Sequence, residues 1–384
     1  MINNQRWLSQ SFFVFFFTWG IFLPYWTGWL VQAKNLTVAD ASMIMAFGLV
    51  ARAVATMFVF PFMSKYMSNK KIIITFTMLA LCAAVFYIPA TSRVSLLLIT
   101  ILFSLVYPTL MPAIESGASS LVQQGKVHYG KSRSYGSIGF VIAVLIISML
   151  TGFWGEQAIL WSMIIGLIFL LIKQFMPTPG PLLTKPSIED RRQKLSMKEL
   201  WKVKTFPVVL IVVFLLQGAH AAYYNYGYIY LQELDVNAFY IGMIINIAVI
   251  FEILYFMKAD NFLSKWRPSS LFLLAGAGST LRWVLIFLFP NVGIFIISQA
   301  LHALSFGMAH IAFIRYLTIS LPKEQIPNAQ GIYSGLALSL STAILTFVGG
   351  YLYEIQPGLA FLGMIVCTVP AIILILISRK NLRY

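Results

Sequence analysis

Long apolar runs recur along the entire chain and are separated by short polar segments. A helix needs about 20 residues to cross the hydrocarbon core of a bilayer, and each run approaches or exceeds that length. The pattern therefore predicts an all-α membrane protein with twelve transmembrane helices. The expected spans cover residues 9–31, 42–63, 72–91, 94–121, 134–153, 157–175, 206–230, 239–258, 269–289, 293–314, 329–352 and 358–378.

One long polar stretch, residues 177–204, lies between the sixth and seventh spans. It predicts two six-helix bundles, residues 1–176 and 205–384, joined by a linker. The charged residues of this linker are Lys185, Glu189, Asp190, Arg191, Arg192, Lys194, Lys198, Glu199, Lys202 and Lys204.

The two halves of the sequence resemble each other weakly. Leu36-Thr37-Val38 leads into the second span, and Leu234-Asp235-Val236 leads into the eighth. Such internal repeats are typical of transporters whose binding site lies between two halves, so we expect the bundles to be related by pseudo-twofold symmetry. Chance similarity between apolar helices is the alternative.

Composition excludes most other classes of protein. Of the 384 residues, 59% are hydrophobic and only 10% are charged, against about 25% charged residues in a soluble domain. The net charge of +15 is explained by the Lys and Arg residues that cytoplasmic loops carry, so no nucleic-acid partner is expected. Cys82 and Cys367 lie in apolar runs and predict neither a disulfide nor a metal site.

The distribution of basic residues predicts the orientation of the chain. If the N-terminus is inside, the outer loops contain only Lys34 and Arg93. The positive-inside rule then places both termini and the linker in the cytoplasm. The first apolar run is too long for a cleavable signal and is expected to be a span.

Several ionisable residues lie where the bilayer makes them costly. Arg52, Glu115, Glu252 and Arg282 fall inside expected spans, and Arg133 lies at the start of another. Each such group costs about 2.5–3.5 kcal/mol near the bilayer centre, so it usually lines an aqueous cavity or a substrate path. The alternative is ion pairs that only hold helices together.

Two pairs of these residues are expected to meet. Glu115 and Arg133 are equally far from the turn that joins the fourth and fifth spans, so they should lie at similar depth on neighbouring helices. Arg282 and His302 have the same relation to the turn between the ninth and tenth spans.

Arg52 and Glu252 occupy similar depths in opposite halves, which predicts one central polar layer built from both bundles. Further polar and aromatic side chains could complete it, although histidines in spans are often packing residues and aromatic residues often form interface belts. The residues that we add to the layer are Gln217, His220, Tyr223 and Trp26.

Motifs of enzymes are missing from the sequence. It contains no glycine-rich phosphate-binding loop, no metal-ligand spacing and no nucleophile elbow. We therefore expect no enzyme activity, no cofactor and no metal. A membrane-embedded enzyme would need a large outer loop, whereas every outer loop expected here is short. A sensor without transport activity is a further alternative.

Five short stretches carry a resemblance to a known family. The stretches are Arg6-Trp7-Leu8, Gly20-Ile21-Phe22-Leu23-Pro24, Gly48-Leu49-Val50-Ala51-Arg52, Tyr129-Gly130-Lys131 and Leu215-Leu216-Gln217-Gly218-Ala219-His220-Ala221-Ala222-Tyr223-Tyr224. Together they resemble the major facilitator superfamily, in particular the 3-phenylpropionate transporter family, which is related to lactose permease and the nucleoside permeases. The resemblance runs nearly from end to end.

The resemblance implies proton-coupled import of a small organic acid by alternating access. Glu115 and Arg133 fall where the lactose permease group has a substrate-binding carboxylate and arginine. Lactose permease also carries a proton-handling carboxylate one turn after its histidine, and Ser305 stands at that position here. The acidic signature that follows the second span is likewise degenerate in residues 64–71.

We therefore expect a monomeric proton symporter of the bacterial inner membrane for an aromatic carboxylate such as 3-phenylpropionate. Arg52 or Arg133 would hold the carboxylate, Glu252 is the first candidate for the carried proton and Glu115 the second. A sugar or nucleoside symporter is the main alternative, and a multidrug exporter is a weaker one. The expected substrate-binding residues are Arg52, Glu115, Arg133, Arg282, His302, Gln217, His220, Trp26 and Tyr223.

Overall fold

A computed structural model describes residues 4–125, 127–184, 197–263, 266–322 and 325–381. These ranges contain twelve helices, continuous or made of consecutive segments, that are long and apolar enough to cross a membrane. The predicted number of spans is confirmed. Most of the predicted linker charges, from Lys185 to Lys194, lie outside the described residues.

The chain divides into two compact units. The first contains residues 1–36 and 47–194, and the second contains residues 37–46 and 195–384. Helix α2 (Val38–Val54) is divided, because its residues up to Ala46 belong to the second unit. The other elements of the first unit are α1 (Asn4–Gln32), η1 (Ala55–Val59), α3 (Phe60–Met63), α4 (Asn69–Phe86), α5 (Arg93–Val106), η2 (Tyr107–Thr109), α6 (Leu110–Gln123), α7 (Tyr129–Trp154), α8 (Gln157–Gln174) and η3 (Gly180–Leu182).

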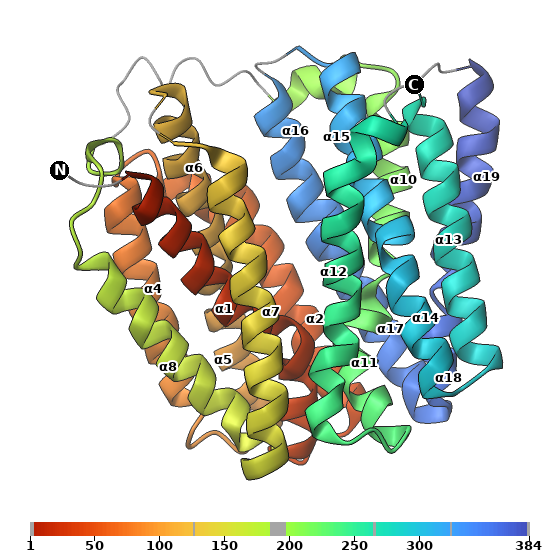
Figure 1. Ribbon diagram of the computed structural model, residues 1–384, viewed down its shortest axis with the longest axis horizontal. Coiled ribbons are helices and arrows are strands. Elements are labelled where there is room, and N and C mark those ends of the chain that lie inside the picture. The colour runs from red at the N-terminus through yellow and green to blue at the C-terminus, as the bar shows by residue number, and fades with distance from the viewer. Residues whose placement is uncertain (1–3, 126, 185–196, 264–265, 323–324, 382–384) are drawn as a thin grey trace. The chain divides into compact units, whose positions relative to one another are not determined.

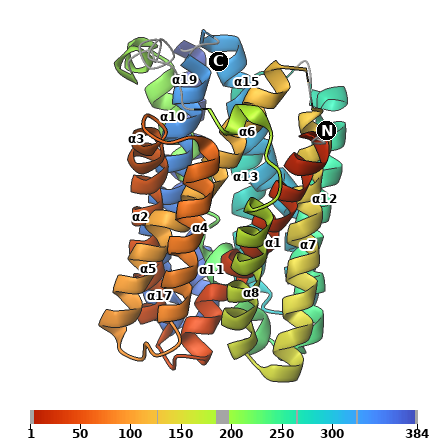
Figure 2. The same ribbon diagram turned by 90° about the vertical axis from the view of Figure 1, so that its left-hand side faces the viewer.

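Helix α1 packs along both α7 and α8, and the three helices lie side by side (Figures 1 and 2). Two glycines allow the approach of α7. A Cβ atom on Gly20 would lie 2.8 Å from the carbonyl oxygen of Phe140, and one on Gly139 would collide with the carbonyl oxygen of Phe13. The helices therefore touch backbone to backbone, as small residues permit in membranes.

Local signals in the loops fix the ends of the helices. Ser68 and Ser92 accept hydrogen bonds from the first turns of α4 and α5, which is the usual role of an N-cap serine. After α1, the Lys34 ammonium donates to the carbonyl oxygens of Tyr87 and Ala90, both at 2.8 Å, and of Ile88 at 3.3 Å. Lys34 therefore joins the loop after α1 to the turn between α4 and α5.

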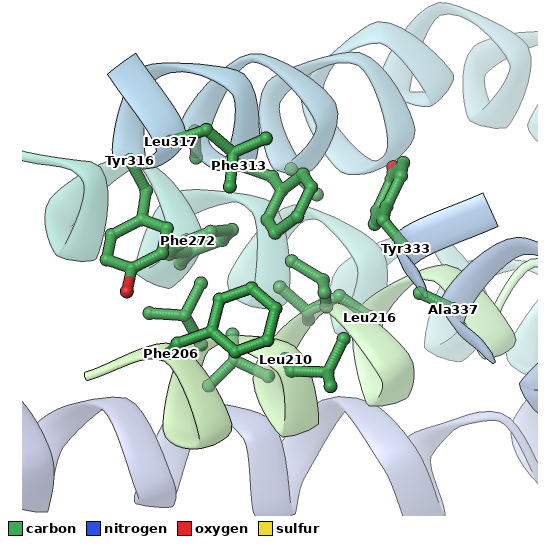
Figure 3. Packing of buried hydrophobic residues seen from close by; sticks show 14 of the residues in the cluster. Phe206, Leu210, Leu216, Phe272, Phe313, Tyr316, Leu317, Tyr333 and Ala337 are labelled. Carbon is green, nitrogen blue, oxygen red and sulfur yellow. The ribbon is translucent and has the colours of Figure 1, made fainter. Parts of the chain in front are cut away.

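The second unit has its core around α10, α13 and α15. Phe206, Phe272 and Phe313 meet there, and Tyr333 stacks on Phe313 with a centroid distance of 4.4 Å (Figure 3). The elements are η4 (Met197–Lys202), α10 (Phe206–Gly218), α11 (Ala221–Glu233), α12 (Ala238–Leu263), α13 (Pro268–Leu288), α14 (Val292–His302), η5 (Ala303–Gly307), α15 (Met308–Ser320), α16 (Ile326–Ile332), η7 (Tyr333–Leu340), α17 (Ser341–Ile355), α18 (Pro357–Leu362) and α19 (Ile365–Asn381).

Four spans are irregular close to candidate residues. The seventh span breaks between α10 and α11, and His220 lies in the break. The π-helical segments η1 and η5 begin soon after Arg52 and directly after His302, and η7 begins at Tyr333. Because π-bulges occur frequently at functional sites, these irregularities direct attention to the side chains beside them.

Candidate functional site

The second unit contains a buried chain of three ionisable side chains. Arg282 on α13 is fully buried, and its Nη1 atom lies 2.9 Å from Nδ1 of His302. The other ring nitrogen of His302, Nε2, lies 3.5 Å from the carboxylate of Glu252 on α12. The predicted meeting of Arg282 and His302 is confirmed, and Glu252 joins them.

The donor and acceptor roles in this chain follow from chemistry. A guanidinium can only donate hydrogen bonds, so Nδ1 of His302 must accept the one from Arg282. The ring proton of a neutral His302 therefore sits on Nε2, which points toward Glu252. About a quarter of the Glu252 side chain is exposed, whereas His302 is almost completely buried.

Arg282 is a buried cation whose donors are only partly used. Besides His302, it donates from Nη2 to the side-chain oxygen of Gln299 over a long 3.5 Å, and its Nε–H has no acceptor among the described residues. No carboxylate of the residues that the structure describes forms an ion pair with Arg282 within 4.0 Å. The rings of Tyr223 and Trp283 each lie 4.6 Å from the guanidinium carbon. Arg282 and the two rings thus place a cation beside aromatic side chains.

His220 forms a second histidine site next to the first. Its Nδ1 lies 3.0 Å from the carbonyl oxygen of Leu216, which can only accept, so Nδ1 carries a proton. Nε2 lies 3.0 Å from the hydroxyl of Ser305 in η5. The rings of His220 and His302 are 5.5 Å apart. Ser305 therefore contacts His220 through its hydroxyl.

Gln217 contacts a different group of residues. Its side-chain nitrogen donates to the hydroxyl of Tyr333 at 2.8 Å, and Nδ1 of His310 lies 3.1 Å from the same hydroxyl. Tyr333 was not a candidate from the sequence, because one tyrosine among eighteen carries no distinguishing signal.

In the first unit, the predicted pair of Glu115 and Arg133 is confirmed. Nε of Arg133 lies 3.9 Å from a carboxylate oxygen of Glu115, and both side chains are about one third exposed. Tyr129 donates its hydroxyl to this carboxylate, 3.0 Å from each oxygen. The guanidinium also lies 4.0 Å from the centroid of the Phe16 ring. The contribution of Tyr129 could not be predicted, since a depth argument does not show in which direction around the helix axis a side chain points.

The two other candidates in the first unit have aromatic neighbours. Arg52 is half-buried and lies 4.8 Å from the ring centroid of Trp19. Trp26, expected as a wall for the substrate ring, is fully buried against Trp29, with a centroid distance of 4.9 Å, and against Phe103. These contacts give Trp26 a packing role within the unit.

The sequence matches the family described as "MFS_1 like family" over residues 5–362. The chain belongs to this family. It is therefore a secondary transporter of the major facilitator type and a multi-pass membrane protein, and it is not an enzyme.

Two proteins of known sequence illustrate the range within this family of transporters. The chain is 29% identical over 379 residues to a protein of Escherichia coli strain K12 described as a probable 3-phenylpropionic acid transporter, covering 97% of this chain and 98% of that one. It is 24% identical to the maltose permease of Geobacillus stearothermophilus, covering 97% and 94% of the two chains.

Solved structures agree on the fold. The crystal structure of the nucleoside transporter NupG matches with a TM-score of 0.80 at 17% identity and covers the whole of both chains. The crystal structure of a peptide transporter, POT, matches with a TM-score of 0.74 at 12% identity, covering 97% and 93%. At these identities the likeness establishes the fold of this MFS_1-like transporter and not its substrate.

Proposed function

We propose that this transporter imports a small aromatic carboxylate together with protons across the bacterial inner membrane. The observation that carries the proposal is the buried guanidinium of Arg282, which lies 4.6 Å from the ring centroids of both Tyr223 and Trp283. No carboxylate of the described residues contacts Arg282 directly, and a substrate carboxylate could do so through charge-assisted hydrogen bonds. The aromatic faces would pack against the substrate ring.

Arg282 is the first choice for the carboxylate anchor over Arg52 and Arg133, the two candidate arginines of the first unit. Arg133 already lies beside the carboxylate of Glu115, so its charge is balanced. Arg52 remains the second choice, because the Trp19 ring beside it also combines a cation with an aromatic face. The relation to the protein described as a 3-phenylpropionic acid transporter supports the same class of substrate.

Proton coupling belongs to the same proposal. Glu252, the first candidate for the carried proton, pairs with the imidazole of His302 beside Arg282. Glu115 is the second candidate for the carried proton. Both termini are proposed to lie in the cytoplasm, and the carrier is proposed to work as a monomer by alternating access.

The experiment is uptake of labelled 3-phenylpropionate into proteoliposomes with an imposed inward proton gradient. We expect accumulation that a protonophore abolishes. Arg282→Gln should reduce uptake by roughly 10- to 100-fold, since hydrogen bonds to charged groups contribute about 1.5–3 kcal/mol. Arg93→Gln at the exposed start of α5 makes the same change of charge outside the site and should leave uptake unaltered. Accumulation that survives the protonophore would reject symport.

A sugar or nucleoside symporter is the second candidate. The carboxylate of Glu115, held by Tyr129 and next to Arg133, is a group that could equally bind substrate hydroxyls. Competition against labelled 3-phenylpropionate by carboxylates, sugars and nucleosides separates the two functions. Uptake of a sugar or nucleoside, with none of any aromatic acid, would replace the first proposal by the second.

A further inference from the structure

The hydrogen bond from Arg282 prevents a proton from binding Nδ1 of His302. Nδ1 of an imidazole has one lone pair in the ring plane. In His302 this lone pair already accepts the hydrogen bond from Nη1 of Arg282, 2.9 Å away. A proton can bind Nδ1 only after the guanidinium has left, because two donors cannot share this lone pair. Protonation of His302 and its bond to Arg282 are thus mutually exclusive.

We propose that Nδ1 of His302 is the atom that takes up the transported proton, and that it does so when a substrate carboxylate draws Arg282 away. This inference rests on the proposed function and refines it. Glu252, to which the sequence assigned the proton, becomes the counter-ion of the imidazolium across the 3.5 Å that separates it from Nε2.

The groups that face His302 are compatible with this exchange. Arg282 is held weakly elsewhere, by one long hydrogen bond to Gln299 and by ring faces that do not fix a hydrogen-bonding pattern. The titratable groups around the His302 ring are Glu252 on α12, Arg282 on α13, His220 at the break between α10 and α11, and Tyr223 and Tyr224 on α11.

The exchange conserves charge. In the resting state, the cation of Arg282 and the carboxylate of Glu252 flank a neutral His302. In the loaded state, the substrate carboxylate pairs with Arg282, and the proton on His302 pairs with Glu252. The sum is zero in both states, so neither the empty nor the loaded site places net charge in the membrane, where charge is costly.

Thermodynamic linkage makes the device reciprocal. Substrate binding promotes protonation of His302, and protonation promotes substrate binding by the same factor. On the side where the substrate leaves, Arg282 returns to Nδ1 and expels the proton. One proton accompanies each carboxylate.

A single substitution separates binding from protonation. His302→Asn keeps an oxygen that accepts from Arg282, as Nδ1 does, but that oxygen does not titrate in the accessible pH range. Calorimetry of 3-phenylpropionate binding in buffers of different ionisation enthalpy counts the protons taken up. We expect about one proton per substrate in the unaltered protein. The H302N protein should bind 3-phenylpropionate more weakly, because the linked protonation is lost, and its binding should be independent of pH and occur without proton uptake.

The competing assignment gives different results. If Glu252 carried the proton, E252Q would abolish proton uptake and H302N would retain it. That result would overturn the inference while leaving the proposed function intact. Absence of 3-phenylpropionate binding in the unaltered protein would instead count against the proposed function.

A measurement without substrate tests the inference independently. In protein labelled with ¹⁵N-histidine, the His302 signal is assigned by its loss in H302N. With Arg282 present, it should keep the Nε2–H tautomer from about pH 5 to 8, the range in which histidine ordinarily titrates. In Arg282→Met, the freed Nδ1 should become protonated within that range. A His302 that titrates there with Arg282 in place, or that fails to titrate in R282M, would overturn the inference.

Discussion

The contact between α1 and α7 gives a sharp test of the fold. A methyl group on Gly139 would collide with the carbonyl oxygen of Phe13, which is backbone and cannot turn aside. Gly139→Ala must therefore push the two helices apart. Overpacking of this kind costs about 1–3 kcal/mol, and each kcal/mol lowers Tm by roughly 2–4 °C in a domain of this size. We expect a decrease in Tm of about 2–12 °C.

The same helix supplies the matched control. A Cβ atom on Gly130 would meet no atom within 4 Å, and alanine has the higher helix propensity, so Gly130→Ala should be neutral or slightly stabilising. The Tm of both variants is measured by heating the protein in detergent and following the loss of the monodisperse peak in size-exclusion chromatography. Equal Tm for G139A and the unaltered protein, or equal losses for the two variants, would refute the backbone contact.

Four further predictions concern Lys34, Tyr129 and the two termini. Lys34→Met removes three hydrogen bonds to carbonyl oxygens and should lower Tm by a few degrees in the same assay. Burial lowers the pKa of Lys34 from 10.5, so the folded chain releases this proton at lower pH than the unfolded chain. The contribution of Lys34 to stability should rise as pH climbs through the lowered pKa toward 10.5, and the Tm gap between the unaltered protein and K34M should widen there. Tyr129→Phe removes the hydroxyl that binds Glu115 and should change the apparent affinity for substrate several-fold without changing Tm by more than about 2 °C, which uptake kinetics would show. A reporter that is active only in the cytoplasm should be active when fused to either terminus. A fusion that is active only outside the cytoplasm would contradict the proposed orientation.

Depth along a helix could be predicted from the sequence, because the number of residues from a turn fixes it. That argument placed Glu115 with Arg133 and Arg282 with His302, and both pairs are in contact. It could not place side chains around the helix axis. In a membrane, lipid-facing and buried positions are both apolar, so no periodic contrast reveals which face of a span points inward.

Aromatic residues show this limit most clearly. Trp26 and Trp19 both lie on α1, but Trp26 packs against Trp29 whereas Trp19 lies against Arg52, a difference that the sequence does not reveal. The π-helical segment η5 was also beyond prediction, because it carries no proline to mark an irregular helix. Its geometry decides that Ser305 reaches His220.

The π-turn η5 also has an evolutionary consequence. Such a turn arises when one residue is inserted into a regular helix, and each residue of an α-helix turns the chain by about 100°. Deleting one residue of η5 would thus swing His310 and the rest of α15 around the axis while His302 stayed in place. Homologues with a straight tenth span should therefore align here with a one-residue gap, and their histidines beyond the gap would face other neighbours.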